Sequence, residues 1–155
     1  MRLTVFSDYN LRLLIYLGAR PDGLSTIADI AAAYDISKNH LMKVAQQLGA
    51  QGYIETVRGK GGGLRLKRPP SEISIGVLLR RTESDTALVE CFDEAAARCR
   101  IEPACVMRGA LRRAQEAFFK TLDRYTLADL LRPRAQLAPI LFRRAGARGR
   151  AAKTG

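Results

Sequence analysis

The fold is decided by residues 25–51, whose sequence is STIADIAAAYDISKNHLMKVAQQLGAQ. Residues 25–34 predict a short helix, and Asp35 and Ile36 then turn the chain. Ser37 is a good N-cap for a second helix that continues to about Gln51. Two helices joined by a short turn predict a helix-turn-helix.

The flanking residues extend this unit on both sides. Before it, residues 7–19 predict a helix that Ser7 or Asp8 can cap, with apolar residues at helical spacing at Leu11, Leu14, Ile15 and Leu17. After it, residues 53–57 and 64–67 are rich in β-forming residues, and RGKGGG at 58–63 joins them. This pattern indicates a β-hairpin with a basic, glycine-rich tip, the wing. Pro69 and Pro70 end the second strand, and residues 73–80 predict a further short helix.

The chain therefore predicts a mainly α protein, a winged helix-turn-helix domain over residues 1–81. Residues 82–104 show little periodicity and predict a loop that holds the three cysteines, Cys91, Cys99 and Cys105. A long helix is expected over 105–125, and Thr126 is expected to cap a short helix over 127–131 that Pro133 ends, within a C-terminal part that continues to 141. Residues 142–155 form a basic tail, expected to be disordered.

The long helix carries two interleaved repeats of seven. Met107, Ala114 and Thr121 form one repeat, and Leu111, Phe118 and Tyr125 form the other. Such a seam is typical of helices that pair, so the sequence predicts a homodimer built on this helix. The alternative is that the apolar stripe packs on its own domain.

The net charge of +11 makes a polyanion the first partner to consider. The charge is uneven: residues 37–68 hold seven Lys or Arg and one acid, whereas residues 82–102 hold six acids and two Arg. An ordinary solvated face is the alternative explanation of the basic part. Neither a signal-peptide start nor an apolar run long enough for a membrane span is present, so we expect no membrane association and a cytoplasmic location.

DNA is the polyanion that a helix-turn-helix binds, because its second helix enters the major groove. Ser37 and the helix N-terminus suit a phosphate, Asn39 can pair with adenine, and Lys43 can reach guanine or phosphate. In the wing, Arg58 and Lys60 flank a flexible backbone that fits a minor groove. A generic flexible hairpin is the alternative for the wing. The expected DNA-binding residues are Ser37, Lys38, Asn39, His40, Lys43, Arg58, Lys60 and Gly61.

The only histidine, His40, lies far from the cysteines in sequence, so DNA contact or plain exposure is expected for it rather than metal ligation. The three cysteines fall within 15 residues. Their odd number argues against a disulfide framework and favours soft-metal ligation. Three thiolates leave the question of a fourth ligand open.

Several stretches together resemble a known family. They are MRLT at 1–4 with Asp8 and Tyr9, VRGKGGG at 57–63, the three cysteines with Pro103 and Ala104 before the last of them, and YTLADL at 125–130. Over about residues 1–141 the chain resembles the nitric-oxide-sensing repressors of the winged-helix family that also includes the iron–sulfur assembly regulator IscR.

The resemblance implies a homodimer with one iron–sulfur cluster per subunit, of the 4Fe–4S type with 2Fe–2S as the alternative. It implies that Cys91, Cys99 and Cys105 are ligands, that Asp8 of the partner subunit is the fourth, and that nitric oxide releases operator DNA. Arg12 can hold Asp8, pair with Asp85, or form a structural salt bridge elsewhere. IscR-like members have a histidine at the position of Arg108, which favours the nitric-oxide-sensing branch here. The seven residues between Cys91 and Cys99 exceed the four or five of some members.

Other functions remain open on the sequence alone. Three cysteines and one aspartate can also hold zinc, which would leave a zinc-stabilised regulator. A cluster-free winged-helix regulator and an IscR-like regulator of iron–sulfur assembly are further alternatives. Thiol catalysis is not expected, because no histidine lies near the cysteines in sequence and no glycine-rich nucleotide loop precedes a helix.

Overall fold

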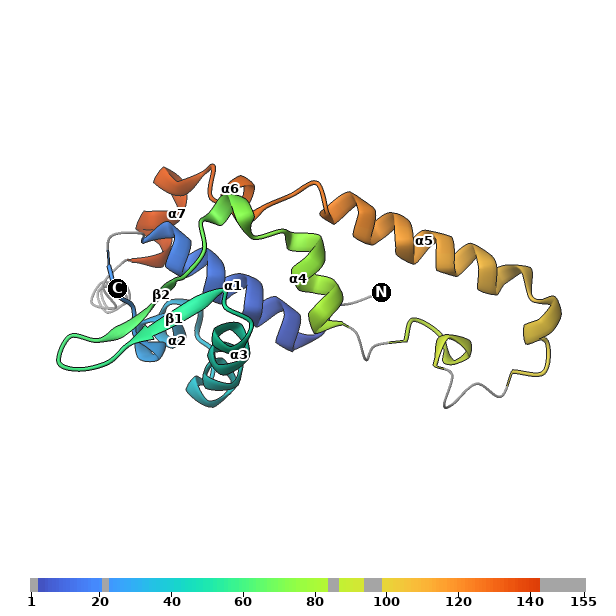
Figure 1. Ribbon diagram of the computed structural model, residues 1–155, viewed down its shortest axis with the longest axis horizontal. Coiled ribbons are helices and arrows are strands. Elements are labelled where there is room, and N and C mark those ends of the chain that lie inside the picture. The colour runs from blue at the N-terminus through green and yellow to red at the C-terminus, as the bar shows by residue number, and fades with distance from the viewer. Residues whose placement is uncertain (1–2, 21–22, 84–86, 94–98, 143–155) are drawn as a thin grey trace, which may run out of the picture.

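The computed structural model describes residues 3–20, 23–83, 87–93 and 99–142. The expected tail from 143 onward lies outside these residues. Within them the chain is mainly helical with one antiparallel two-stranded sheet, as predicted (Figure 1). The elements are α1 Val5–Ala19, α2 Ile27–Tyr34, α3 Lys38–Ala50, β1 Ile54–Val57, β2 Gly63–Leu66, α4 Ile75–Thr82, α5 Val106–Leu122, α6 Leu127–Leu130 and α7 Arg134–Leu141.

Helix α1 forms the centre of the domain, but its N-cap was predicted wrongly. Thr4, rather than Ser7 or Asp8, caps it, and the Thr4 hydroxyl oxygen accepts the N–H of Ser7 at 3.1 Å. The Thr4 N–H in turn donates to the Glu83 carboxylate at 2.8 Å. Ser7 is fully buried, and its hydroxyl donates to the Thr82 hydroxyl oxygen at 2.7 Å. The start of α1 is therefore fixed by the end of α4.

The helix-turn-helix forms as predicted, with α2 beginning two residues late. Thr26 and Asp29 make a capping box there, and the backbone and hydroxyl hydrogen bonds from Thr26 lower the pKa of Asp29. Asp35 ends α2 in the left-handed region at φ 54°. The apolar faces of the helices then meet in one core, which includes Leu13, Leu14 and Leu17 of α1, Ile30 of α2, and Leu41, Val44 and Leu48 of α3.

The wing is a regular hairpin in which Ile54 pairs with Leu66 and Val57 pairs with Gly63. Its strands are one residue out of step with the prediction at three of their four ends. Leu64 is buried, and its backbone exchanges hydrogen bonds of 2.8 and 3.1 Å with Ser25, the residue before the Thr26 cap. The wing is therefore attached directly to the start of the helix-turn-helix.

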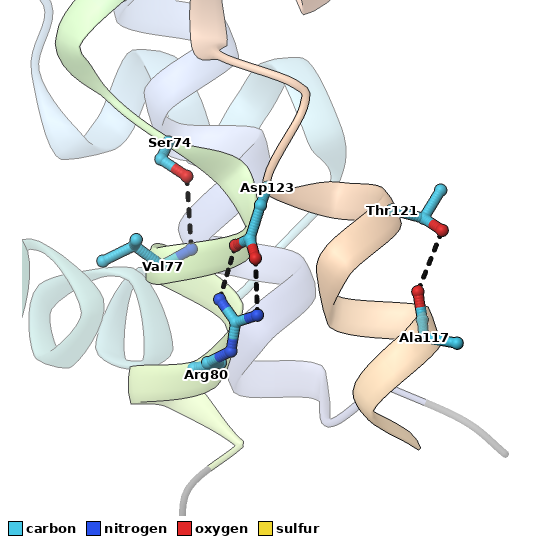
Figure 2. Close-up of polar contacts among 6 residues, drawn as sticks. All are labelled: Ser74, Val77, Arg80, Ala117, Thr121 and Asp123. Carbon is cyan, nitrogen blue, oxygen red and sulfur yellow. Dashed lines mark hydrogen bonds and ion pairs between the residues drawn. The ribbon is translucent and has the colours of Figure 1, made fainter. Parts of the chain in front are cut away.

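The end of helix α5 joins the winged part along helix α4 (Figure 2). The Arg80 guanidinium of α4 donates two hydrogen bonds, of 2.5 and 2.6 Å, to the Asp123 carboxylate. These bonds lower the pKa of Asp123. The Ile75 N–H donates to the Tyr125 carbonyl, and the Leu127 N–H donates to the Ile73 carbonyl, both at 2.9 Å. The helix predicted over 105–125 ends at Leu122 because the following residues pair with the α4 start instead. Beyond this joint α5 extends away from the winged part (Figure 1).

The chain returns to α1 through its last two helices. Thr126 begins α6 with a capping box to Asp129, which confirms the predicted cap. Helix α7 packs on α1, where the ring of Phe142 meets that of Tyr16 edge-on at 5.1 Å and Leu141 is buried. No helix among the described residues is long and apolar enough to cross a bilayer.

Candidate functional site

Helix α3 presents a polar face to solvent. Its buried residues, Leu41, Val44 and Leu48, fix which side of the helix meets the core. The opposite side therefore exposes every residue of α3 that the sequence pointed to, namely Lys38, Asn39, His40 and Lys43. Ser37 is exposed at the N-cap position, but its side chain makes no capping hydrogen bond. The predicted reading residues thus lie together on one surface.

Two further residues of this surface were missed in the sequence. Met42 is 53 % exposed although it is apolar, and Gln46 is exposed one turn beyond it. Asn39, Met42, Lys43 and Gln46 follow the spacing i, i+3, i+4, i+7, which places them on one stripe of the helix. The same helical periodicity that identifies the buried face also identifies the exposed face, and applying it to the exposed face would have found both residues.

His40 contacts α1 as well as facing solvent. Its ring lies 6.1 Å from the ring of Tyr9, at an interplanar angle of 41°. Tyr9 follows Asp8 directly, so the start of α1 contacts helix α3 beside the predicted fourth ligand. His40 belongs to no cluster of three or more potential metal-ligating side chains within the described residues.

Some basic side chains of the wing are already paired within the chain, whereas others form no ion pair among the described residues. Arg65 pairs with Glu55 at 2.6 Å, and Arg68 donates to the backbone carbonyl of Gly52 at 3.0 Å while stacking 5.0 Å from the ring of Tyr53. Arg58, Lys60 and Gly61 are exposed at the tip. Neither Arg58 nor Lys60 forms an ion pair within the described part of the chain, so both charges are available to a polyanion.

The glycine-rich tip is a tight turn. Gly59 and Gly61 have φ values of 104° and 81°, which glycine adopts without strain. A Cβ on Gly62 would lie 2.9 Å from the Gly59 carbonyl oxygen, so a side chain does not fit there. The tip therefore presents Arg58 and Lys60 from a compact backbone.

All three cysteines have free thiols. Cys91 is half-buried in a 3-10 helix at Glu90–Phe92, and Cys99 is exposed. Cys105 is the N-cap of α5, and its sulfur accepts the N–H of Arg108 at 3.4 Å. A helix N-terminus favours an anionic group, so this position suits a thiolate ligand. The donor set therefore has the chemistry of a thiolate-held metal site.

The fourth predicted ligand, Asp8, lies on the exposed side of α1. Arg12 holds its carboxylate at 2.8 Å, one of the pairings expected for Arg12, and both side chains are about two-fifths exposed at 41 % and 43 %. Asp85, the other expected partner, lies outside the described residues. Among the described residues of this single chain, no three His, Cys, Asp or Glu side chains gather closely enough to hold a metal ion.

Comparison with solved structures agrees with this architecture. The chain resembles IscR from T. potens with a TM-score of 0.69, at 22 % identity over 86 % of this chain and 88 % of that one. It resembles CymR from Staphylococcus aureus with a TM-score of 0.66, at 27 % identity over 83 % of this chain and 97 % of that one. The winged-helix fold predicted from the sequence is confirmed.

Sequence comparison is more specific. The chain is 50 % identical to the HTH-type transcriptional regulator NsrR of Geobacillus kaustophilus, over 94 % of this chain and all of the relative. It is 49 % identical to the regulator of the same name from Bacillus subtilis, over 91 % of this chain and 97 % of the relative. Residues 3–133 match the Rrf2 model, described as an iron-dependent transcriptional regulator. The resemblance inferred from the sequence is confirmed, and the chain belongs to the Rrf2 family of transcriptional regulators.

Proposed function

We propose that this regulator is a homodimeric repressor that holds one iron–sulfur cluster per subunit and leaves its operator when nitric oxide reaches the cluster. Three free thiols in the segment that leads into α5 carry the proposal. A nitric-oxide-sensing role also fits the name NsrR that the relatives bear. When bound, the cluster would supply iron that reacts with nitric oxide. Because the proposed target is operator DNA, we infer that the protein acts in the cytoplasm.

The proposed ligands are Cys91, Cys99, Cys105 and Asp8 of the partner subunit, for a 4Fe–4S cluster, with 2Fe–2S as the alternative. Asp8 is assigned to the partner because the resemblance to the nitric-oxide-sensing repressors implies a fourth ligand from the second subunit. A carboxylate is a harder donor than a thiolate, so its bond to iron should be the weakest of the four. Arg12 fixes the Asp8 carboxylate at 2.8 Å and thereby orients it.

Helix α1 gives the proposed ligand a physical connection to the DNA-reading helices. Tyr9 meets His40 of α3, and the Arg12 guanidinium lies 5.7 Å from the ring centre of Tyr34 on α2. If Asp8 is tied to the partner's cysteine segment, α1 is held, and both helices of the helix-turn-helix are held with it. Loss of the tie frees the spacing of the two recognition helices, which must match successive major grooves about 34 Å apart.

The DNA contacts are divided between two surfaces. We assign Ser37, Lys38 and the α3 N-terminus to phosphate, and Asn39, His40 and Lys43 to the major groove. Arg58, Lys60 and Gly61 of the wing are assigned to the minor groove. Residues 1–81 would then read DNA, 82–104 hold the ligands, and 105–141 pair the subunits.

Dimerisation through α5 is part of the proposal. None of its 17 residues is buried in the single chain. Val106 and Met107 are 83 % and 63 % exposed, and Tyr125 just beyond the helix is 48 % exposed. Apolar surface of this kind along a projecting helix is covered when a second copy packs against it.

Anaerobic purification followed by an absorption spectrum and a nitric oxide titration tests the proposal. Iron, sulfide and a coloured spectrum should be present, and nitric oxide should lower operator affinity in step with the spectral change. Cys99→Ala should lose the cluster, whereas Arg58→Ala should weaken operator binding and keep the spectrum. A colourless protein containing zinc supports the zinc-stabilised regulator instead, and unchanged DNA binding with nitric oxide would refute the sensor.

A further inference from the structure

Arg108 touches both ends of the cysteine segment. Its Nε donates to the Cys91 carbonyl at 3.4 Å, and its Nη2 pairs with the Glu102 carboxylate at 3.1 Å. Its backbone N–H donates to the Cys105 sulfur at 3.4 Å. A single residue thus links the first cysteine, the residue before Pro103, and the last cysteine.

Arg112 reinforces the same contact one helical turn later. Its guanidinium lies 5.6 Å from the ring centre of Phe92, the residue after Cys91. Residues four apart share one face of a helix, so Arg108 and Arg112 together meet two consecutive residues of the 3-10 helix at Glu90–Phe92. The first two turns of α5 therefore hold this short helix in place.

These contacts differ in kind from scattered surface pairs. The Arg108 and Glu102 side chains are each only 31 % exposed, although each bond by itself contributes little stability. Their importance lies in closing a loop, because Cys91 and Glu102 are eleven positions apart and a free loop loses entropy when its ends are brought together. Because these contacts already bring the ends of the loop together, part of that entropy is lost when the protein folds, and less remains to be lost when a cluster binds.

We propose that Arg108 is a positioning residue that holds the backbone of Cys91 beside the N-terminus of α5, with Arg112 in support, so that the first and last cysteines of the segment are held at one residue before a cluster binds. This rests on the proposed cluster function. Groups that orient metal ligands typically contribute about 10- to 100-fold in metal affinity. The effect acts through backbone placement, because Arg108 contacts a carbonyl rather than the Cys91 sulfur.

The test uses the full chain reconstituted anaerobically, in wild type, Arg108→Ala and Arg113→Ala. Arg113 is the matched control, because it is exposed on the same helix and forms no ion pair or ring contact within the described residues. Iron release to a ferrous chelator should be about tenfold faster in Arg108→Ala and unchanged in Arg113→Ala. The visible circular dichroism of the bound cluster should change only in Arg108→Ala. Unfolding midpoints of the cluster-free proteins should match.

The Arg108→Lys variant distinguishes the effect of the guanidinium contacts from the effect of the positive charge alone. Lysine keeps the positive charge but lacks the planar fork that reaches a carbonyl and a carboxylate together, so iron release should stay fast. Full rescue by lysine, or wild-type iron release in Arg108→Ala, would overturn the positioning role. If the wild-type protein retains no iron–sulfur cluster at all, the proposed function fails instead, which keeps the two results distinguishable.

Discussion

Replacing Gly76 by alanine should strain the joint between α4 and α5. A Cβ at this position would lie 2.7 Å from the Asp123 nitrogen and 2.9 Å from the Asp123 Cα, and it would also overlap the carboxylate. Backbone atoms cannot rotate out of the way, and Arg80 holds the side chain of Asp123 by two hydrogen bonds. The added methyl group therefore has to displace the end of α5 from α4.

The magnitude follows from two opposing effects. Overpacking a tight contact costs about 1–3 kcal/mol of the free energy of unfolding. The better helix propensity of alanine returns at most about 1 kcal/mol. A net loss of up to about 2 kcal/mol is expected, and for a chain of 155 residues this lowers the unfolding midpoint by up to about 8 °C.

Gly49 provides the matched control, because a Cβ there meets nothing within 4 Å. Gly49→Ala should therefore stabilise the protein by up to about 1 kcal/mol. Thermal and urea unfolding of the cluster-free variants, followed by circular dichroism at one protein concentration, measures both changes. A Gly76→Ala protein as stable as the Gly49→Ala control would refute the close packing that we describe at this joint.

Four other changes have defined outcomes. Met42→Ala should weaken binding only to operators with thymine at one position, because an apolar side chain contacts the thymine methyl group; binding to a panel of single-base variants checks this. Arg58→Ala should reduce the slope of log affinity against log salt by about 0.9, as measured by titrations at several salt concentrations. Burial raises the pKa of Tyr34 from 10.0 to about 12, so the contribution of Tyr34 to stability should be constant below pH 10 and be lost between about pH 10 and 12; the alkaline fall in stability should therefore be smaller in Tyr34→Phe, as alkaline unfolding curves would show. Thr126→Ala removes the α6 cap and should cost about 1 kcal/mol in urea unfolding.

Local sequence signals predicted the elements well and their ends less well. The helix-turn-helix and the Thr126 cap depend on residues close together in the chain, and the structure confirms them. Thr4 caps α1 through a local hydrogen bond to Ser7, whereas its contact with Glu83, 79 positions away, is one that no local pattern could reveal. The end of α5 was missed for the same reason, since residues that fit a helix pair with the start of α4 instead.

In the candidate site, too, the features that depend on local sequence could be predicted and those that depend on distant contacts could not. The exposure of Asn39 and Lys43 follows from helical periodicity, and the same periodicity extended outward would have added Met42 and Gln46. The contacts of Arg108 with Cys91 and Glu102 were not accessible, because they depend on how a loop without periodicity folds back on α5. Asp8 as the fourth ligand stays a prediction.

The start of α1 contacts both the residues that lead into the segment proposed to bind the cluster and the helix proposed to bind DNA. Thr4 and Ser7 bind Glu83 and Thr82 at the end of α4, and the cysteine segment begins just beyond them. Asp8 lies one residue after Ser7, and Tyr9 contacts the recognition helix α3. Any shift of the cysteine segment relative to α4, or of Asp8 relative to a partner, therefore acts on the same turn of α1. Since that turn packs on α3, a small local change at the proposed ligands has a direct mechanical path to the residues that we propose contact DNA.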